Sequence, residues 1–172
     1  RAPRCEGRVS NGSVEKLAAT PPDVAMMKGM TFEDLPGDWP TRPLTDTTVA
    51  PDVVDLVVRE SDREGGCLSI LLCGDGDRLL QPVTITDLDG EPRVVHREPF
   101  DRFLDHLGGE LGGIVVAVGR PSGLQPDDEA RAWHEAAIAS CRDHDVPLLG
   151  TYLATAHGVV EMPVWEQLRT AG

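Results

Sequence analysis

The chain has 172 residues, of which 16 are Lys or Arg and 29 are Asp or Glu, giving a formal net charge of −13. This acidic excess argues against non-specific binding to nucleic acid or to anionic membrane surfaces, because both need a basic face. Hydrophobic residues make up 40% of the chain, which suffices for one packed core, and no apolar run reaches the roughly 18 residues of a membrane span. We therefore expect one globular domain in the cytoplasm, with its 4 cysteines as free thiols.

Composition divides the chain into an extension, an arm, a domain and a tail. Residues 1–29 hold five basic and three acidic residues and no aromatic one, and we expect them to be a flexible N-terminal extension. Residues 30–47, rich in Pro, Asp and Thr, predict an extended arm that Trp39 helps to fix to the domain; a partner-binding arm is the alternative. The domain itself is expected over residues 48–165, followed by a C-terminal tail at 166–172.

The first half of the domain predicts a helix followed by a β-hairpin. Apolar residues spaced three or four apart indicate a helix over 48–63, which a pair of glycines ends. The apolar run Cys67–Cys73 has the length of a strand, and Leu79–Ile85 gives a second strand. Gly74–Asp77, between them, has the composition of a turn. A polar loop is expected from Thr86 to Arg93.

The second half predicts alternating helices and strands. Phe100–Leu107 has one apolar helical face, and the continuous apolar run Gly113–Val118 is typical of a strand buried on both faces. Pro126 opens a further helix, and strands are expected at Leu148–Ala154 and Val159–Met162. The helix that links two of these strands predicts a right-handed βαβ unit. We therefore predict the α/β fold class: a three-layer mixed sheet sandwiched by helices.

One motif stands between the buried strand and the helix after it. The segment Val118–Gly123 reads Val-Gly-Arg-Pro-Ser-Gly, then Pro126–Ala130 reads Pro-Asp-Asp-Glu-Ala, and Leu148–Thr151 reads Leu-Leu-Gly-Thr. Together with the order of elements, the stretch from Cys67 to Met162 resembles the RadC-like branch of the JAB/JAMM (MPN) domains. In that family the loop reads His-Asn-His-Pro-Ser-Gly, the helix starts Pro-Ser-x-x-Asp, and the next strand reads Leu-Leu-Asp-His. The resemblance implies a cytidine-deaminase-like topology.

The family's metal ligands are replaced here. Its two metal-binding histidines fall on Val118 and Arg120, and its final metal-binding Asp falls on Ala130, or on Arg131 without a one-residue gap. Val and Ala have no donor atom, and Arg keeps its proton and has no lone pair to offer. A catalytic zinc site needs three protein ligands. The resemblance therefore implies a domain without the zinc site of a JAMM metalloprotease, and we expect no cofactor.

The family's other catalytic groups are also changed. The Ser that polarises the substrate carbonyl is replaced by Asp127 or Asp128, and the nearest candidates for the acid that activates water are Glu60 and Glu64.

The same resemblance implies a vestigial ligand-binding pocket, which we expect at Gly119, Arg120, Ser122, Asp127 and Asp128. Arg120 follows a strand at the edge where open α/β sheets bind ligands. Its guanidinium could retain an anion or a peptide carboxylate. The alternative, which we favour, is an intramolecular ion pair with Asp127 or Asp128.

Other chemistry-bearing residues predict no site of their own. His134, Cys141 and His144 share one side of a helix, but His134 and His144 lie about 15 Å apart along its axis and cannot share one ion. Cys141 with His144 could, given further ligands, although a core thiol and a surface imidazole are the expectation. Ser122 lacks the Gly-x-Ser-x-Gly context of a nucleophile, and we interpret it as a turn residue.

We therefore expect a non-catalytic RadC/JAB-like domain that acts as a protein-binding or oligomeric scaffold, with an unknown protein partner or as a homodimer. Two alternatives stay open. One is a hydrolase with a relocated metal, or with acid–base chemistry from Asp127, Asp128, Glu64 and histidines. The other is a small anion- or carboxylate-binding sensor centred on Arg120.

Overall fold

The computed structural model describes residues 35–86, 88, 95 and 97–163. The expected extension at 1–29, the tail at 166–172 and most of the polar loop Thr86–Arg93 lie outside the described residues. The described part is an α/β fold with one five-stranded mixed sheet, which confirms the predicted fold class. Among its helices, none combines the length and the apolar character that crossing a bilayer requires.

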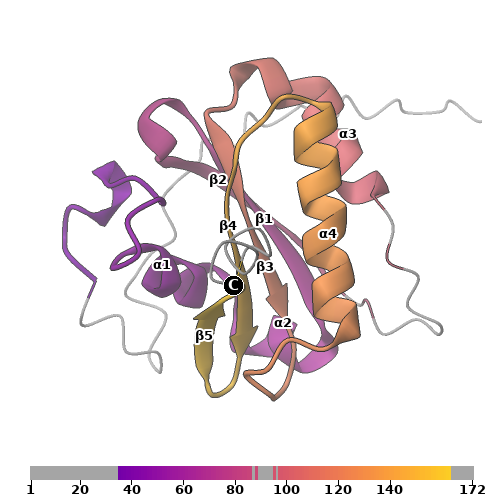
Figure 1. Ribbon diagram of the computed structural model, residues 1–172. Coiled ribbons are helices and arrows are strands. Elements are labelled where there is room, and N and C mark those ends of the chain that lie inside the picture. Colours follow the sequence, from indigo (N-terminus) through magenta and orange to yellow (C-terminus); the bar gives the residue numbers. More distant parts are fainter. Residues whose placement is uncertain (1–34, 87, 89–94, 96, 164–172) are drawn as a thin grey trace, which may run out of the picture. The chain divides into compact units, whose positions relative to one another are not determined.

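The sheet has the strand order β2-β1-β3-β4-β5 (Figure 1). Its strands are β1 (Cys67–Cys73), β2 (Leu79–Ile85), β3 (Gly113–Gly119), β4 (Leu148–Thr155) and β5 (Gly158–Glu161). β3 and β4 are parallel and are joined through a helix, as expected, whereas the other neighbours are antiparallel. Every residue of β1 and β3 is buried, because both strands are central and covered on both faces.

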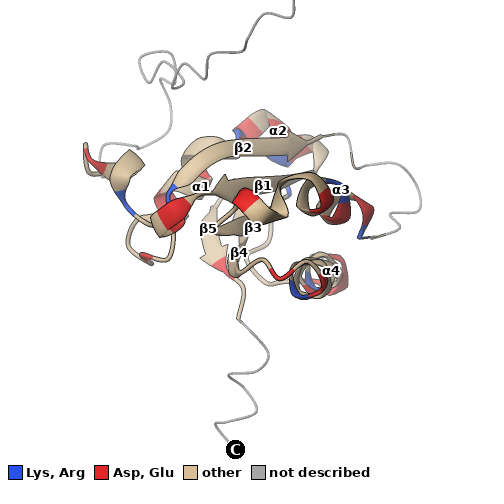
Figure 2. Ribbon diagram, turned by 90° about the horizontal axis from the view of Figure 1, so that it is seen from above, with Lys and Arg blue, Asp and Glu red and all other residues tan. Residues whose placement is uncertain are grey.

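Helices cover the two faces of the sheet (Figure 2). On one face, α3 (Glu98–Leu107) and α4 (Asp128–Asp143) pack against the even-numbered residues of β1 and β3. On the other face, α1 (Ala50–Val57) packs against the odd-numbered residues of the same strands. This alternation follows from the two-residue period of a strand, which sends successive side chains to opposite faces. The fold therefore has two apolar cores, one on each side of the sheet.

The segment before α1 lies on the α1 face. It forms a short 3₁₀ turn at Trp39–Thr41, and Trp39 packs against the apolar core of that face. Leu44 is buried in the same core, and its backbone N–H donates to the oxygen of Asp77, 2.8 Å away. Further 3₁₀ turns lie at Asp75–Asp77, in the expected turn, and at Gly108–Glu110 after α3.

The expectation of one helix over 48–63 is wrong, because the chain forms α1 and then α2 (Glu60–Gly65) with Val58 extended between them. A buried arginine stabilises the break. Arg63 donates from Nε to the oxygen of Val58 at 2.9 Å and from Nη1 to the oxygen of Thr155 at 2.8 Å. Its Nη2 reaches both the backbone oxygen and the carboxylate of Asp55, at 3.1 and 2.8 Å. Carbonyls that lose their helical partners at the end of α1 are thus satisfied by one guanidinium.

Candidate functional site

The carboxyl ends of β3 and β4 meet at one edge of the sheet because the two strands are parallel. Arg120 follows β3 at this edge, and its backbone N–H donates to the oxygen of Ala154 in β4 at 3.0 Å. The loop from Arg120 to Asp127 then leads into α4. This is the edge at which the sequence predicted a ligand-binding site.

The guanidinium of Arg120 is surrounded by acceptors of its own loop. Nε and Nη2 donate to the backbone oxygen of Gly123 at 3.1 and 2.7 Å, and Nη2 also contacts the oxygen of Gln125. Nη1 pairs with the carboxylate of Asp127 at 2.5 Å, and only 14% of the Arg120 side chain is exposed. The arginine therefore closes the loop on itself.

Asp127 connects this loop to α4. It is the N-cap of the helix, and its Oδ1 accepts the backbone N–H of Ala130 at 2.8 Å while Oδ2 pairs with Arg120. A carboxylate at this position also suits the partial positive charge of a helix N-terminus. The partner that sequence left open between Asp127 and Asp128 is thus Asp127, whereas Asp128 is exposed and pairs with Arg131 at 3.1 Å.

Gly119 and Ser122 do not join this cluster. Gly119 is buried, and a Cβ built on it would overlap the Sγ of Cys67 and lie 3.2 Å from Val58 on the α1 side of the sheet. Ser122 lies exposed in the loop. Of the five residues expected to share a pocket, the structure brings Arg120 and Asp127 into contact and directs Asp128 to another partner.

The positions that the resemblance assigns to metal ligands lie at the end of β3 and the start of α4. Val118 and Ala130 are both buried in the apolar core on the α3 and α4 side of the sheet. Arg120 reaches the first turn of α4 through Asp127. By contrast, Glu60 and Glu64 are exposed on α2. Within the described ranges, no group of three or more His, Cys, Asp or Glu residues is placed to hold a metal ion.

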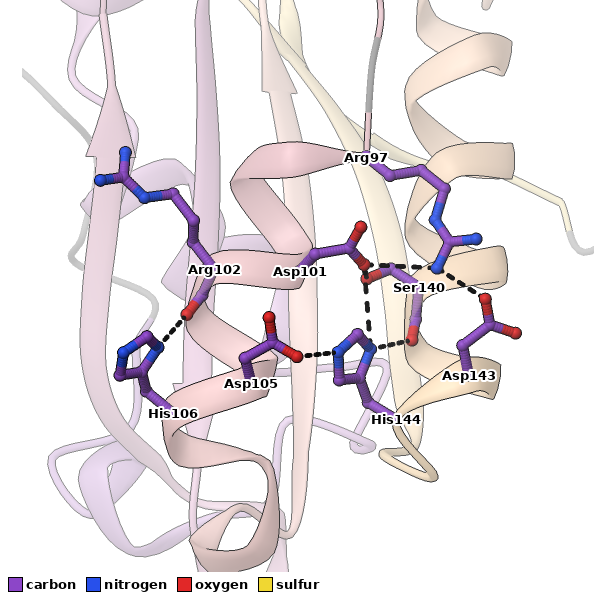
Figure 3. Close-up of polar contacts among 8 residues, drawn as sticks. All are labelled: Arg97, Asp101, Arg102, Asp105, His106, Ser140, Asp143 and His144. Carbon is purple, nitrogen blue, oxygen red and sulfur yellow. Dashed lines mark hydrogen bonds and ion pairs between the residues drawn. The ribbon is translucent and has the colours of Figure 1, made fainter.

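A second polar cluster joins α3 to α4, and the sequence did not predict it (Figure 3). Arg97, just before α3, pairs with Asp143 on α4 at 2.7 Å and with Asp101 on α3 at 3.3 Å. Asp101 also accepts a hydrogen bond from the buried hydroxyl of Ser140, and this bond, with the charge of Arg97, lowers the pKa of Asp101. The hydroxyl of Ser140 therefore stabilises the ionised form of the Asp101 carboxyl.

His144, the C-cap of α4, also joins the two helices. We call this set of polar contacts between α3 and α4 the seam. The Nδ1 of His144 lies 2.8 Å from the backbone oxygen of Ser140, and its Nε2 lies 2.8 Å from Oδ1 of Asp105 on α3. The hydrogen bond with the Ser140 carbonyl, followed by that with Asp105, raises the pKa of His144. The expected surface imidazole is thus 18% exposed and engaged at both nitrogens.

One signal in the sequence could have revealed this seam. Arg97, Asp101 and Asp105 are spaced four residues apart, and this spacing places them on one face of a helix. The seam pairs that face with the last turn of α4.

Two other groups singled out on α4 lie in the core. Burial raises the pKa of the Cys141 thiol to about 12. His134 is 1% exposed, and neither ring nitrogen has a hydrogen-bond partner among the residues that the structure describes. Burial lowers the pKa of His134, since the charged imidazolium is not solvated there.

Comparison of the chain with protein-family models and with curated proteins gave no match.

Proposed function

We propose that this chain is a degenerate RadC/JAB-like domain that acts through contacts with protein rather than by turning over a substrate. The observation that carries the proposal is the closed loop at the carboxyl ends of β3 and β4. Arg120 donates to two backbone oxygens of the loop and pairs with Asp127, and Asp127 in turn caps α4. Groups at this edge that could take part in chemistry are thus engaged in holding the loop.

The arrangement of three mapped positions supports the resemblance. Val118 and Arg120 lie at the end of β3 and Ala130 lies in the first turn of α4; Val118 and Ala130 share one apolar core, and Arg120 pairs with Asp127, which caps that turn. A site that once held an ion between the strand end and the helix would contract in this way if apolar side chains and an Arg–Asp pair replaced its ligands. The parallel β3-α4-β4 unit and the hairpin of β1 and β2 agree with the order of elements in that family.

The two alternatives require this arrangement to open. An anion sensor centred on Arg120 needs an external anion to displace Asp127, whose carboxylate already occupies the guanidinium. A hydrolase that uses Asp127 and Asp128 as acid and base needs both to leave their arginines. Neither alternative is favoured by a contact at this edge.

Isothermal titration with zinc, acetate and inorganic phosphate tests the non-catalytic half of the proposal. We expect no saturable binding to the wild type. Saturable binding of zinc at one site per chain would overturn it, and so would saturable binding of acetate or phosphate that is lost in Arg120→Ala but kept in Arg131→Ala. Arg131 is the matched control because it pairs with an exposed carboxylate on the outside of the same helix.

Cross-linking in the cells that make the protein tests the other half. The lysines of the chain are Lys16 and Lys28, so a carboxyl-reactive reagent is needed to sample the domain. Reproducible links from its exposed carboxylates to one protein species, a second copy included, support the proposal. Links found only within one chain contradict it.

A further inference from the structure

The seam between α3 and α4 contains two contacts that differ in how they respond to protons. At the start of α3, Arg97 pairs with Asp143 at the end of α4, 2.7 Å away. An arginine keeps its proton at every pH that proteins survive. In the last turn of α3, Asp105 pairs with the imidazole of His144, 2.8 Å away. Histidine is the side chain whose charge changes near neutral pH.

Both nitrogens of the His144 ring face acceptors, so the ring satisfies both contacts when it carries two protons. Nδ1 faces the backbone oxygen of Ser140 and Nε2 faces a carboxylate oxygen of Asp105, and both oxygens only accept hydrogen bonds. A second carboxylate, that of Asp101 on α3, lies 3.8 Å from Nδ1. Arg97 lies one contact further away, through Asp101, and Asp143 pairs with Arg97 in turn. A neutral ring would present a lone pair to one of its two acceptors.

We propose that His144 is a proton-dependent latch that holds the last turn of α3 against α4. In its charged form the ring bridges the two helices. When it loses a proton, the bond to Ser140 within its own helix is kept and the bond to Asp105 is released. The start of α3 stays fixed, because Arg97 keeps its partners and Phe100 remains in the core. Release therefore concerns the last turn of α3 and the 3₁₀ turn after it.

The direction of the response follows from the charges. The carbonyl of Ser140 and the carboxylates of Asp105 and Asp101 all favour the charged ring, and they raise its pKa. The latch is therefore closed at low pH and opens as the pH rises through the raised pKa of the folded state.

Native-state amide exchange by NMR tests the latch with two reporters on the same helix. The backbone N–H of Gly108 donates to Leu104 at the end of α3, and that of Phe100 donates to Arg97 at its start. After correction for intrinsic exchange, we expect the opening constant of Gly108 to rise at least about threefold relative to Phe100 between about pH 6 and about pH 9.

Two variants remove the latch and one serves as a control. His144→Gln should abolish the relative rise, and so should Asp105→Asn, whose side chain is 64% exposed and whose replacement leaves the core intact. His106→Gln should keep it, because the hydrogen bond that His106 makes with the backbone oxygen of Arg102 stays within α3 (Figure 3). Equal responses of Gly108 and Phe100 in the wild type, or a relative rise that survives Asp105→Asn, would overturn the proposal.

Discussion

At the scale of the residue, the fork of Arg120 holds the loop before α4. Its planar guanidinium donates in three directions, to Gly123, Gln125 and Asp127, which a single ammonium on a lysine cannot reproduce. We predict that Arg120→Lys lowers the free energy of unfolding by about 1.5–3 kcal/mol, the range for hydrogen bonds that involve a charged group. Urea denaturation followed by circular dichroism measures it. Arg131→Lys, beside an exposed partner, should unfold at the wild-type midpoint, and an equal midpoint for Arg120→Lys would refute this role of the fork.

Unlike the guanidinium of Arg120, the buried ring nitrogens of His134 have no hydrogen-bond partner among the described residues. Burial in the fold favours the neutral ring and lowers the pKa of His134. In the unfolded chain the ring takes up a proton once the pH falls below the ordinary pKa of 6.5. Stability is therefore complete above that pH and is lost as the pH falls, by at most about 1.4 kcal/mol per pH unit for one group. We predict that His134→Leu raises the free energy of unfolding by about 1 kcal/mol at neutral pH and reduces its loss in acid.

Urea denaturation at a series of pH values measures both effects. His106→Gln is the control, because His106 is exposed, and it should keep the wild-type slope. An unchanged acid slope in His134→Leu would show that another group governs the acid response.

At the scale of the element, the break between α1 and α2 depends on Arg63. Its side chain is 5% exposed and satisfies three backbone oxygens as well as the carboxylate of Asp55. Removing one partner of a buried pair leaves the other uncompensated, and this costs several kcal/mol. We predict that Arg63→Met lowers the free energy of unfolding by about 3 kcal/mol, measured by denaturant unfolding. Arg59→Met, at the exposed start of α2, should cost far less; similar losses for both would contradict the role of the guanidinium.

The same break shows what the sequence could and could not predict at this scale. Cys67–Cys73 and Leu79–Ile85 are predicted with the bounds that the structure has, because an apolar run or a half-buried strand is a local pattern. The interruption at Val58 depends on Arg63 meeting Thr155, a contact between residues far apart in the sequence. Periodicity along α1 contains no sign of it.

At the candidate site too, contacts between sequence neighbours could be predicted and contacts between distant residues could not. An ion pair from Arg120 to Asp127 or Asp128 could be expected from their proximity in sequence, and the choice between them is made by the N-cap geometry of α4. For the seam between α3 and α4, the four-residue spacing of Arg97, Asp101 and Asp105 could indicate a polar helix face, but not its partner, because Asp105 meets His144 only through the tertiary fold.

At the scale of the whole molecule, the two edges of the sheet decide whether strands of different copies can pair. The backbone N–H of Gly112 donates to the oxygen of Cys73, so the carbonyl of Cys73 points toward β3. Backbone groups alternate in direction along a strand, and those of Leu71, two residues earlier, therefore point toward β3 as well. Pro82 stands opposite Leu71 in the register of β1 and β2. Its backbone nitrogen therefore points away from β1, and because proline has no N–H, the outer side of β2 lacks a donor at this position. The other edge strand, β5, is only four residues long.

Natural sheets protect their edges with short strands, prolines and charge, and a net charge of −13 adds repulsion between copies. We predict that Pro82→Val restores an outward N–H on a seven-residue edge strand and produces self-association at micromolar concentration in sedimentation velocity. The free energy of unfolding should change little, because no bond between β1 and β2 is lost. Gln81→Val adds the same side chain at an exposed neighbour whose backbone faces β1. Association of Gln81→Val to the same extent would show that apolar surface, and not the edge N–H, drives the pairing.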